Sequence, residues 1–424
     1  MLTQAPRGTK DVLPRESYRW QRVEAICREV AARAGYLEIR TPVFEHTELF
    51  LRGVGDTTDI VQKEMYTFED KGGRSLTLKP EGTAGAVRAL VEHSLYAGIL
   101  PVKMYYLGAP IFRYEAPQSG RYREHHQFGC EVFGAAEPTC DAEIIALLIR
   151  VLEEVGLAGL TVNINSIGCS HCRPLYHKAM RVYLGDRLSL LCATCNQRFA
   201  HNPLRILDCK SENCQAQLGD APEMLNFLCE GCQKHFDGLM EALTALGIPY
   251  QVNPRIVRGL DYYTRTVFEI EMQSDTGAPL AVCGGGRYDR LVEALGGPSM
   301  PGMGFGLGIE RVLMLLNQRE VILPEPRLYD AYVAALGPDS RMPALRLTHA
   351  LRAAGIKAEM DHAARSLKAQ FKSADKLGAG LVALVGGDEL ARGAVRIRDM
   401  RSKEEKEVPL AEAVAAIHAI LQPV

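Results

Sequence analysis

The sequence predicts a mixed α/β (α+β) fold with more than one domain, and three observations support this prediction. In the first 168 residues, and again from residue 248, apolar residues with helical spacing alternate with short strand-like stretches. Residues 169–247 separate these two parts; they are rich in cysteine and mostly helical by pattern. Beyond residue 328, strands and helices alternate as in a compact α/β domain. A length of 424 residues agrees with about two or three domains.

The composition is that of an ordinary globular protein, with 47% hydrophobic and 24% charged residues and a net charge of −2. This charge neither indicates nor excludes a nucleic acid bound to a local basic patch. The N-terminal stretch MLTQAPRGTKD has no apolar signal-peptide core, and no apolar run reaches membrane-spanning length. We therefore expect a cytoplasmic protein with no membrane partner.

The chain begins with a predicted helix over residues 15–34, which ends before Gly35, a typical residue just beyond a helix. Residues 36–45, YLEIRTPVFE, are predicted to form a strand. Pro42 cannot donate a backbone hydrogen bond, so this strand is expected at an edge or an interface.

A hairpin is predicted in LGAPIFRYEAPQSGRYREHHQFGCEVFG, where Pro, Ser and Gly make the connecting loop. Arg113 and Glu115 alternate with apolar residues and can share one face of the first strand. Arg121 and Arg123 lie in or just after the loop. Guanidinium groups suit phosphate oxygens because their planar fork donates two hydrogen bonds. A solvated hairpin with surface arginines is the alternative interpretation.

The remaining elements follow in order. We expect helices at 141–156, 235–247 and 309–316, and strands at 160–167, 250–257, 266–273, 279–286 and 302–308. A linker is expected near 321–328, followed by C-terminal strands at 329–337, 356–361 and 381–387.

A strand-like stretch with unusual polar content, VRGLDYYTRTVFE, runs from Val257 to Glu269. It brings an arginine, a glycine, an aspartate and two tyrosines together, a mixture that neither a surface strand nor a buried strand requires. Two further stretches are candidates for binding. In GMGFGLGIERVL, alternate glycines leave one strand face bare for a flat ring, with Arg311 at the start of the next helix; close packing is the alternative. In TLKPEGT, Glu81 precedes a helix and is a candidate binding residue; a structural helix cap is the alternative interpretation.

Eight of the twelve cysteines fall between Cys169 and Cys232, in close pairs. In a reducing compartment such pairs favour metal ligation over disulfides, and we hypothesise two structural Zn²⁺ sites. Reduced thiols without metal are the alternative. The hypothesised ligand sets are Cys169, Cys172, Cys229 and Cys232 for one site, and Cys192, Cys195, Cys209 and Cys214 for the other.

Taken together, these stretches resemble the class II aminoacyl-tRNA synthetases. RTPVFEHTELF is similar to motif 1, FRYE with its loop and following arginine to motif 2, and GMGFGLGIERVL to motif 3. PRGTKDVLP, TLKPEGT, RGLDYYTRTVFE and AVCGGGRYD narrow the resemblance to the histidyl-tRNA synthetase family, and SLKAQFKSADKLGA resembles its anticodon-binding domain. The resemblance extends through nearly the whole chain.

The resemblance implies a role for individual residues. Arg113 and Arg258 are the implied catalytic residues. Those implied to bind histidine are Glu81, Gly82, Thr83, Arg113, Gln127, Glu131, Arg258, Tyr262, Tyr263 and Tyr288. Those implied to bind ATP are Arg113, Glu115, Arg121 and Arg311.

The resemblance also implies the domains and partners. An antiparallel sheet with flanking helices is expected in a catalytic domain of residues 1–168 and 248–322, into which the helical domain 169–247 is inserted; residues 328–424 are expected to bind the anticodon. The implied activity joins L-histidine to histidine tRNA with ATP and Mg²⁺, in a homodimer. The alternative is a synthetase-like regulatory subunit of histidine biosynthesis, which lacks the anticodon-binding domain and parts of the catalytic set.

Overall fold

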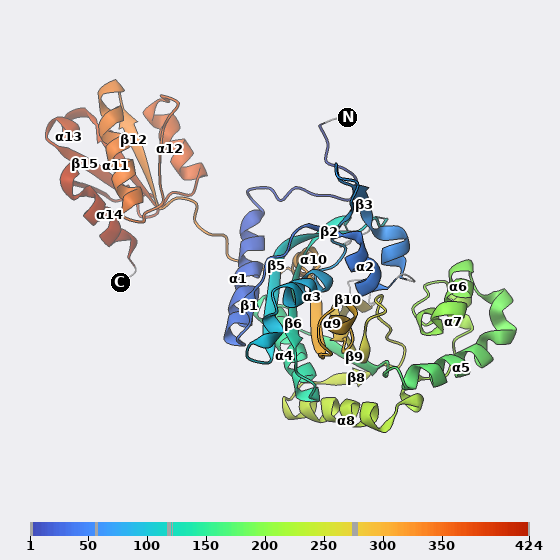
Figure 1. The fold of residues 1–424 in the computed structure, drawn as a ribbon. Coiled ribbons are helices and arrows are strands. Elements are labelled where there is room, and N and C mark those ends of the chain that lie inside the picture. The colour runs from blue at the N-terminus through green and yellow to red at the C-terminus, as the bar shows by residue number, and fades with distance from the viewer. Residues whose placement is uncertain (1–2, 56–57, 117–119, 121, 274–278, 423–424) are drawn as a thin grey trace. The chain divides into compact units, whose positions relative to one another are not determined.

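The structure is a computed structural model that describes every residue except 1–2, 56–57, 117–119, 121, 274–278 and 423–424. The chain divides into two units, Met1–Leu323 and Pro324–Val424 (Figure 1). The expected linker, residues 321–328, has no helix or strand and contains the boundary between them.

An eight-stranded sheet forms the centre of the N-terminal unit, in the order β1-β5-β6-β11-β10-β9-β7-β8. Its strands are β1 (Leu37–Glu38), β5 (Val102–Phe112), β6 (Glu124–Phe133), β7 (Thr161–Ser166), β8 (Tyr250–Val252), β9 (Thr264–Gln273), β10 (Pro279–Arg287) and β11 (Gly302–Gly308). Only the outer pairs, β1 with β5 and β7 with β8, are parallel; the six central strands pair antiparallel, as expected for this fold class.

The alternation of β6 separates the two faces of this sheet. Phe128, Cys130 and Val132 are buried in the hydrophobic core, and the residues between them, including Gln127 and Glu131, point to the opposite face. Helices α1 (Ser17–Arg33), α4 (Pro138–Glu154), α8 (Glu230–Ala245) and α10 (Ile309–Gln318) supply the other side of that core. The sheet therefore has one apolar face under helices and one face free for polar side chains.

The end of α1 follows the predicted pattern. Gly35 adopts φ +79°, where a side chain would be strained. Its N–H bonds the carbonyl of Ala32 at 3.0 Å, and the N–H of Tyr36 bonds that of Ala31 at 3.0 Å. These two bonds satisfy carbonyls that the helix leaves unpaired.

The predicted single strand over residues 36–45 is wrong, because the structure has two short strands there. Residues 39–43, including Pro42, separate β1 from β2 (Phe44–His46). Strand β2 belongs to a second sheet, β2-β4-β3, with β3 (Tyr66–Glu69) and β4 (Ser75–Leu78). Helices α2 (Thr47–Val54), α3 (Thr83–Glu92) and α9 (Leu291–Ala294) and a π-helical turn at Ile60–Glu64 complete this region.

The stretch VRGLDYY is also not a strand. Strand β8 ends at Val252 and β9 begins only at Thr264, so the predicted strand over 250–257 is shortened and residues 255–263 are irregular. Pro254 cannot donate to a sheet, which explains the early end of β8. We call residues 255–263 the Arg255–Tyr263 loop.

The insertion, residues 169–247, is helical as predicted and leads into α8, which runs along β8 and β9 in Figure 1. Its other helices are α5 (Cys172–Leu184), α6 (Ala193–His201) and α7 (Glu212–Ala216). Tyr176, Met180 and Ile206 share a hydrophobic core with Tyr263, which precedes β9, and Tyr288, which follows β10. The insertion therefore packs directly behind the region that the sequence marks as functional.

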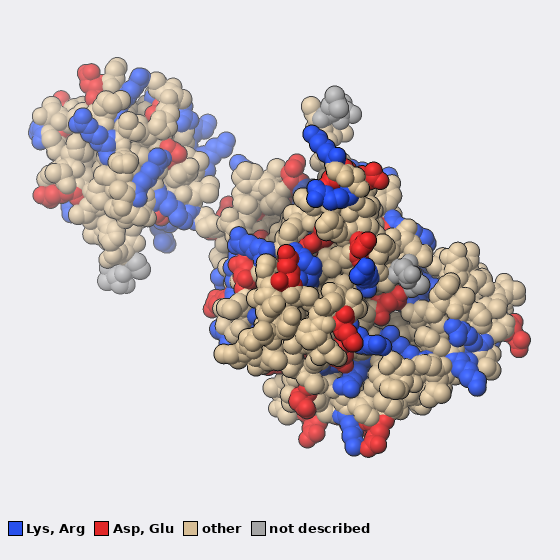
Figure 2. Space-filling view, viewed as in Figure 1, with Lys and Arg blue, Asp and Glu red and all other residues tan. Residues whose placement is uncertain are grey.

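The C-terminal unit has a five-stranded sheet in the order β13-β12-β14-β15-β16, with the first three strands parallel. The strands are β12 (Ala331–Leu336), β13 (Ala358–Met360), β14 (Leu381–Gly386), β15 (Ala394–Asp399) and β16 (Glu405–Pro409); the helices are α11 (Arg341–Ala353), α12 (Leu367–Lys376), α13 (Gly387–Ala391) and α14 (Ala413–Leu421). Basic side chains are spread over the face of this unit drawn in Figure 2. None of the described helices of the chain is long and apolar enough to cross a membrane.

Candidate active site and cysteine clusters

A cavity of about 580 Å³, which we call the open cavity, lies on the polar face of the large sheet. Outside the insertion, its lining includes Arg113, Glu115, His125, Gln127, Arg258, Glu269, Gly284, Gly306, Gly308 and Arg311. The insertion contributes Cys192, Thr194, Arg198, Arg205, Asp208, Cys209 and Lys210. Residues that are far apart in the sequence thus surround one space.

Three arginines predicted from the sequence line the open cavity, and each is held by an acceptor. The Nε of Arg113 donates to the carbonyl of Pro80 at 2.8 Å, and its Nη1 lies 3.9 Å from Glu115. Arg258 donates to the carboxylate of Glu269 on β9. The Nη1 of Arg311 donates to the carbonyl of Ala281 at 2.5 Å. These contacts fix guanidinium groups around a space large enough for a ligand.

His125 also lines the open cavity, and the sequence analysis missed it. Burial and the nearby cations Arg113 and Arg311 lower the pKa of His125 to about 3, so its ring is neutral at physiological pH. The period of two along β6 from Glu131 through Gln127 places His125 on the same face, and this was the signal that could have found it.

A second group of polar side chains, which we call the closed cluster, lies beside the open cavity. It consists of Glu81, Thr83, Tyr106, Glu131, Tyr262, Tyr263 and Tyr288. All seven belong to the described part of the chain, and none of them lines the open cavity. The rings of Tyr262 and Tyr263 are 4.8 Å apart, and those of Tyr262 and Tyr288 are 5.6 Å apart.

Glu131 is fully buried at the centre of the closed cluster. It accepts hydrogen bonds from the hydroxyls of Thr83 at 2.7 Å, Tyr106 at 3.2 Å and Tyr288. Burial nevertheless raises the pKa of Glu131 to about 8, because desolvation of the carboxylate outweighs these hydrogen bonds. A buried carboxylate in this state is stabilised by any cationic ligand that reaches it.

Glu81 has two roles at the start of α3. Its carboxylate accepts the backbone N–H groups of Thr83 at 2.9 Å and Ala84 at 2.7 Å, so it caps the helix as the structural interpretation expected. The hydroxyl of Tyr262 also lies 3.4 Å from it, and burial raises its pKa. Gly82 lies between these groups at the N-cap position of α3.

The glycines of β11 divide between the two regions. A Cβ on Gly304 would overlap the carboxylate of Glu131, so the bare strand face receives the closed cluster there. A Cβ on Gly306 would lie 3.3 Å from Nε2 of Gln127, and Gly306 lines the open cavity. The glycine strand was expected to face a flat ligand; only its second half is exposed to the cavity.

Most predicted residues fall into one of these regions, with two exceptions. Arg121 lies outside the described residues. Arg123 donates to the backbone carbonyl of Glu115 at 3.2 Å and stacks on Tyr114, and it does not line the cavity. Tyr106 was missed because its place within an apolar strand gives no signal beyond that of a core residue.

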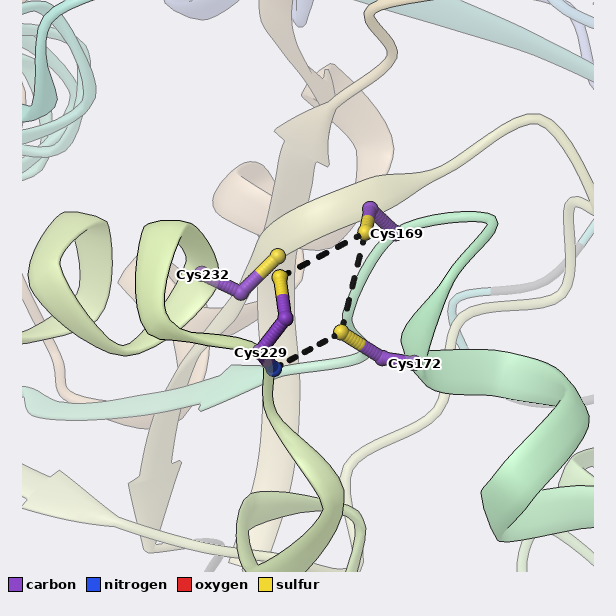
Figure 3. Close-up of side chains that lie close together, drawn as sticks. All are labelled: Cys169, Cys172, Cys229 and Cys232. Atoms are coloured by element: carbon purple, nitrogen blue, oxygen red, sulfur yellow. Dashed lines mark hydrogen bonds between the residues drawn. The ribbon is translucent and has the colours of Figure 1, made fainter.

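The eight paired cysteines form two groups of four, with the memberships hypothesised from the sequence. Within each group the sulfur atoms all lie within 4.8 Å of one another. We call Cys169, Cys172, Cys229 and Cys232 the first thiol cluster (Figure 3), and Cys192, Cys195, Cys209 and Cys214 the second. The first joins the start of the insertion to the start of α8, and the second lies between α6 and α7.

The spacing of these sulfurs suits a tetrahedral metal. Cys169 Sγ is 3.6 Å from Cys172 Sγ and 3.8 Å from Cys229 Sγ, and Cys192 Sγ is 3.9 Å from Cys209 Sγ. A disulfide requires about 2.05 Å, whereas Zn–S bonds of about 2.3 Å in a tetrahedron separate the sulfurs by about 3.8 Å.

Backbone N–H groups also donate to the sulfurs of both clusters. Cys229 N donates to Cys172 Sγ at 3.1 Å, and Cys192 N donates to Cys214 Sγ at 3.2 Å. Such bonds favour the thiolate form that metals bind. The residues present therefore fit Zn²⁺ at both places.

The comparisons with known proteins cover nearly the whole chain. The sequence model of the family described as histidyl-tRNA synthetase matches residues 8–171 and 211–312, and that of the anticodon binding domain matches residues 330–420. A histidine–tRNA ligase of Caldanaerobacter subterraneus is 53% identical over 98% of this chain and 100% of its own length. One of Alkaliphilus oremlandii is 54% identical over 97% of both chains.

Solved structures agree. The apo histidyl-tRNA synthetase of S. aureus superposes with a TM-score of 0.84 at 37% identity, covering 98% of this chain and 99% of its own. Because the family model matches more than half of the chain and relatives match nearly all of it, the chain belongs to the histidyl-tRNA synthetase family.

Proposed function

We propose that the open cavity and the closed cluster together carry out histidine–tRNA ligation. The single observation that carries the residue assignment is that Arg113, Arg258 and Arg311 converge on one cavity next to two buried carboxylates. Relatives that are about half identical over nearly the whole chain are histidine–tRNA ligases, which supports the same activity here.

In the first step, a carboxylate oxygen of histidine attacks the α-phosphorus of ATP, the bond to pyrophosphate breaks, and histidyl-adenylate forms. Two anions must approach each other, and negative charge develops on the phosphate oxygens. Preorganised cations are therefore the main catalytic device. We assign this role to Arg113 and Arg258, which the carbonyl of Pro80 and the carboxylate of Glu269 keep in place.

The closed cluster is our proposed histidine pocket. Its two buried carboxylates, Glu81 and Glu131, would hold the α-ammonium group, because a cation offsets the cost of their burial. Tyr263 and Tyr288 are assigned to the imidazole side. A pocket whose buried polar groups pair with ring nitrogens rejects apolar amino acids, which would leave those groups unpaired. Gly82, Thr83, Gln127 and Tyr262 complete the proposed pocket.

ATP is assigned to the open cavity, with Arg311 and Glu115 beside Arg113. Mg²⁺, when bound, would neutralise part of the phosphate charge. Glu115 offers carboxylate oxygens of the kind that Mg²⁺ takes alongside substrate phosphates. Arg121 remains part of the proposal from the family resemblance alone.

In the second step, the terminal ribose hydroxyl of histidine tRNA attacks the carbonyl carbon of the adenylate, and AMP leaves. The C-terminal unit is proposed to bind the anticodon; from Arg327 onward it carries 15 Lys and Arg against 12 Asp and Glu. This weak excess is only modest support, and the family match over residues 330–420 is the stronger argument.

A homodimer is proposed to form through the region of β1 and β2. There Leu37 is 75% exposed and Phe44 51% exposed, which a monomer in water would not favour. Light scattering tests this proposal: a mass of one chain at micromolar concentration would exclude it.

Each thiol cluster is proposed to hold one structural Zn²⁺, which would leave catalysis to the arginines. All twelve cysteines are free, as is usual in a reducing compartment, which supports a cytoplasmic location. Elemental analysis of the untagged protein should give about two zinc ions per chain; less than one would exclude both sites.

The experiment that tests the activity is charging of histidine tRNA with labelled histidine in the presence of ATP and Mg²⁺. Formation of histidyl-tRNA is the expected result. Histidine binding without charging would favour the regulatory alternative, which the anticodon-binding domain of this chain argues against.

A further inference from the structure

The Arg255–Tyr263 loop carries residues of both proposed binding regions, yet no strand holds it in place. Arg258 lines the open cavity, while Tyr262 and Tyr263 belong to the closed cluster. An irregular loop of this kind needs side-chain contacts to fix its position. Several of those contacts come from the cysteine-rich insertion.

The second thiol cluster supports the side chain of Asp261 in this loop. Between Cys195 and Cys209 the chain places Asn202, whose Nδ2 donates to Asp261 Oδ1 at 3.0 Å. Arg205 Nη1 lies 3.9 Å from the same carboxylate oxygen. The described segment that bears these contacts is short and lies entirely between two cysteines of one cluster.

The same segment is held on the catalytic part by a further ion pair. Arg198 Nη2 donates to Asp59 Oδ2 at 2.6 Å, and its Nη1 donates to the carbonyl of Arg205 at 3.0 Å. Arg205 is itself buried, with only 7% of its surface exposed. A buried charge that faces carboxylates at this distance depends on accurate placement of the backbone that carries it.

The first thiol cluster supports the other end of the loop. Arg173 follows Cys172 directly, and its Nη2 donates to the carbonyl of Tyr263. Its Nε donates to the carbonyl of Ile167 at 3.4 Å. At the beginning of the loop, Arg255 Nη2 lies 3.2 Å from the carbonyls of both Leu218 and Gly219 in the insertion.

We infer that the two thiol clusters, when metal is bound, position the Arg255–Tyr263 loop for histidine, with Asn202, Arg205 and Arg173 as positioning residues. The inference rests on the proposed function. Metal ligation fixes chain segments that four free thiols would leave mobile, because the binding free energy is available only to the ordered arrangement. Metal occupancy and histidine affinity are therefore coupled, and by linkage each raises the other.

The test is the KM for histidine in pyrophosphate exchange with ATP, measured on Asn202→Ala and Arg205→Met. Both variants leave all eight cysteines in place, so two metals per chain are expected. We expect the KM for histidine to rise about tenfold, which corresponds to about 1.4 kcal/mol, with a smaller change in kcat. Arg187→Met is the matched control: Arg187 is in the same insertion, stacks on Tyr183 and bonds the carbonyl of Gln217.

A double-mutant cycle tests whether the bound metal is what positions the Arg255–Tyr263 loop. Cys195→Ser should lower the metal content from two to one per chain and raise the KM for histidine by a similar factor. Adding Asn202→Ala to it should have little further effect, because both changes remove the same support. If Cys195→Ser does not fold, the comparison of Asn202→Ala and Arg205→Met with the control still shows whether these contacts support histidine binding.

Three results would overturn the inference. The first is that Asn202→Ala and Arg205→Met have the same KM for histidine as the control. The second is that Cys195→Ser loses metal but keeps the wild-type KM for histidine. The third is that the wild type contains fewer than one metal ion per chain. Absence of any histidine-dependent exchange by the wild type would instead refute the proposed function, so the two failures are distinguishable.

Discussion

The open cavity and the closed cluster lie on the same face of one sheet but differ in what surrounds their charges. In the open cavity the arginines are charged, and carboxylates and carbonyls hold them in place: Arg258 donates to Glu269, and Arg311 donates to the carbonyl of Ala281. In the closed cluster, the hydrogen bonds to Glu131 come from neutral hydroxyls, and burial raises its pKa. The first region is prepared for an anion and the second for a cation.

This difference explains how one sheet could receive both substrates. Gly304 allows Glu131 to lie flat against β11, and two residues further along Gly306 leaves the strand open to the cavity. The phosphates of ATP would then bind in the open cavity and the α-ammonium group of histidine in the closed cluster, with the histidine carboxylate between them. Variants that alter one region should leave the other intact.

The largest effect is expected from Arg258→Ala. Loss of one preorganised cation should lower kcat/KM in pyrophosphate exchange by a factor of about 100 to 1,000, or about 3 kcal/mol of transition-state stabilisation. Steady-state kinetics measure it. Arg150→Ala is a suitable control, because the Arg150 side chain is 62% exposed and pairs with Glu153 and Glu154 of its own helix, α4. A loss confined to the KM for histidine would mean that Arg258 is a positioning residue.

Glu131→Gln should weaken histidine binding by about tenfold to a hundredfold, since it removes a charged partner of the ammonium group. In the wild type, affinity should rise with pH as the carboxylate ionises around its pKa of about 8. The variant should lose that dependence. Calorimetric titration between pH 6.5 and 8.5 measures it, and an unchanged profile in the variant would assign the titration to another group.

Glu131→Gln should also change how stability depends on pH. The pKa of Glu131 is higher in the folded protein than in the unfolded chain. Between these two pKa values, the higher of which is about 8, the folded protein therefore binds more protons than the unfolded chain. Stability from this group is therefore present at low pH and falls as the pH rises through that window. Glu131→Gln should flatten this slope in denaturant unfolding; a steeper slope would contradict the assignment.

Gly304→Ala and Gly306→Ala compare the two halves of one strand. The first methyl group would overlap the carboxylate of Glu131, whereas the second would meet Gln127 at 3.3 Å. We expect Gly304→Ala to cost about 1–3 kcal/mol of stability and to raise the KM for histidine. Gly306→Ala should cost less and affect the KM for ATP. Thermal unfolding and exchange kinetics measure both, and equal effects would refute the division of the strand.

Tyr106→Phe should have the smallest effect. It removes one of three hydroxyl donors to Glu131, at 3.2 Å, so a loss of about 1 kcal/mol in stability or histidine affinity is expected. The pKa of Glu131 should rise further, because one bond to its ionised form is lost. The pH profile of histidine binding should shift upward by a fraction of a unit; a downward shift would be inconsistent with donation by Tyr106.

Much of the fold could be predicted, because its signals are local. The helix that ends before Gly35, the hairpin strands and the glycine strand before Arg311 follow from periodicity and from turn residues. The first hairpin strand, β5, ends at Phe112, however, so Arg113 and Glu115 follow the strand on which they were predicted to lie. Two predictions failed for the same reason. Pro42 and Pro254 interrupt stretches that look continuous by hydrophobicity: residues 39–43 separate β1 from β2, and β8 ends two residues before Pro254.

The candidate site was only partly predictable. Motifs indicated Arg113, Glu131 and Arg258, but their division between an open and a closed region depends on tertiary packing that no spacing reveals. His125 had a usable signal in the alternation of β6. The contact between Asn202 and Asp261 had none, since it joins residues 59 positions apart through a loop of the insertion.

The most direct test of the central claim is pyrophosphate exchange with ATP and each of the twenty amino acids on the wild-type protein. If the closed cluster selects histidine through its polar groups and the open cavity activates it through its arginines, exchange should occur with histidine and fall to background with apolar amino acids such as phenylalanine and leucine. Comparable exchange with an amino acid that lacks a ring nitrogen, or none with histidine, would contradict the account.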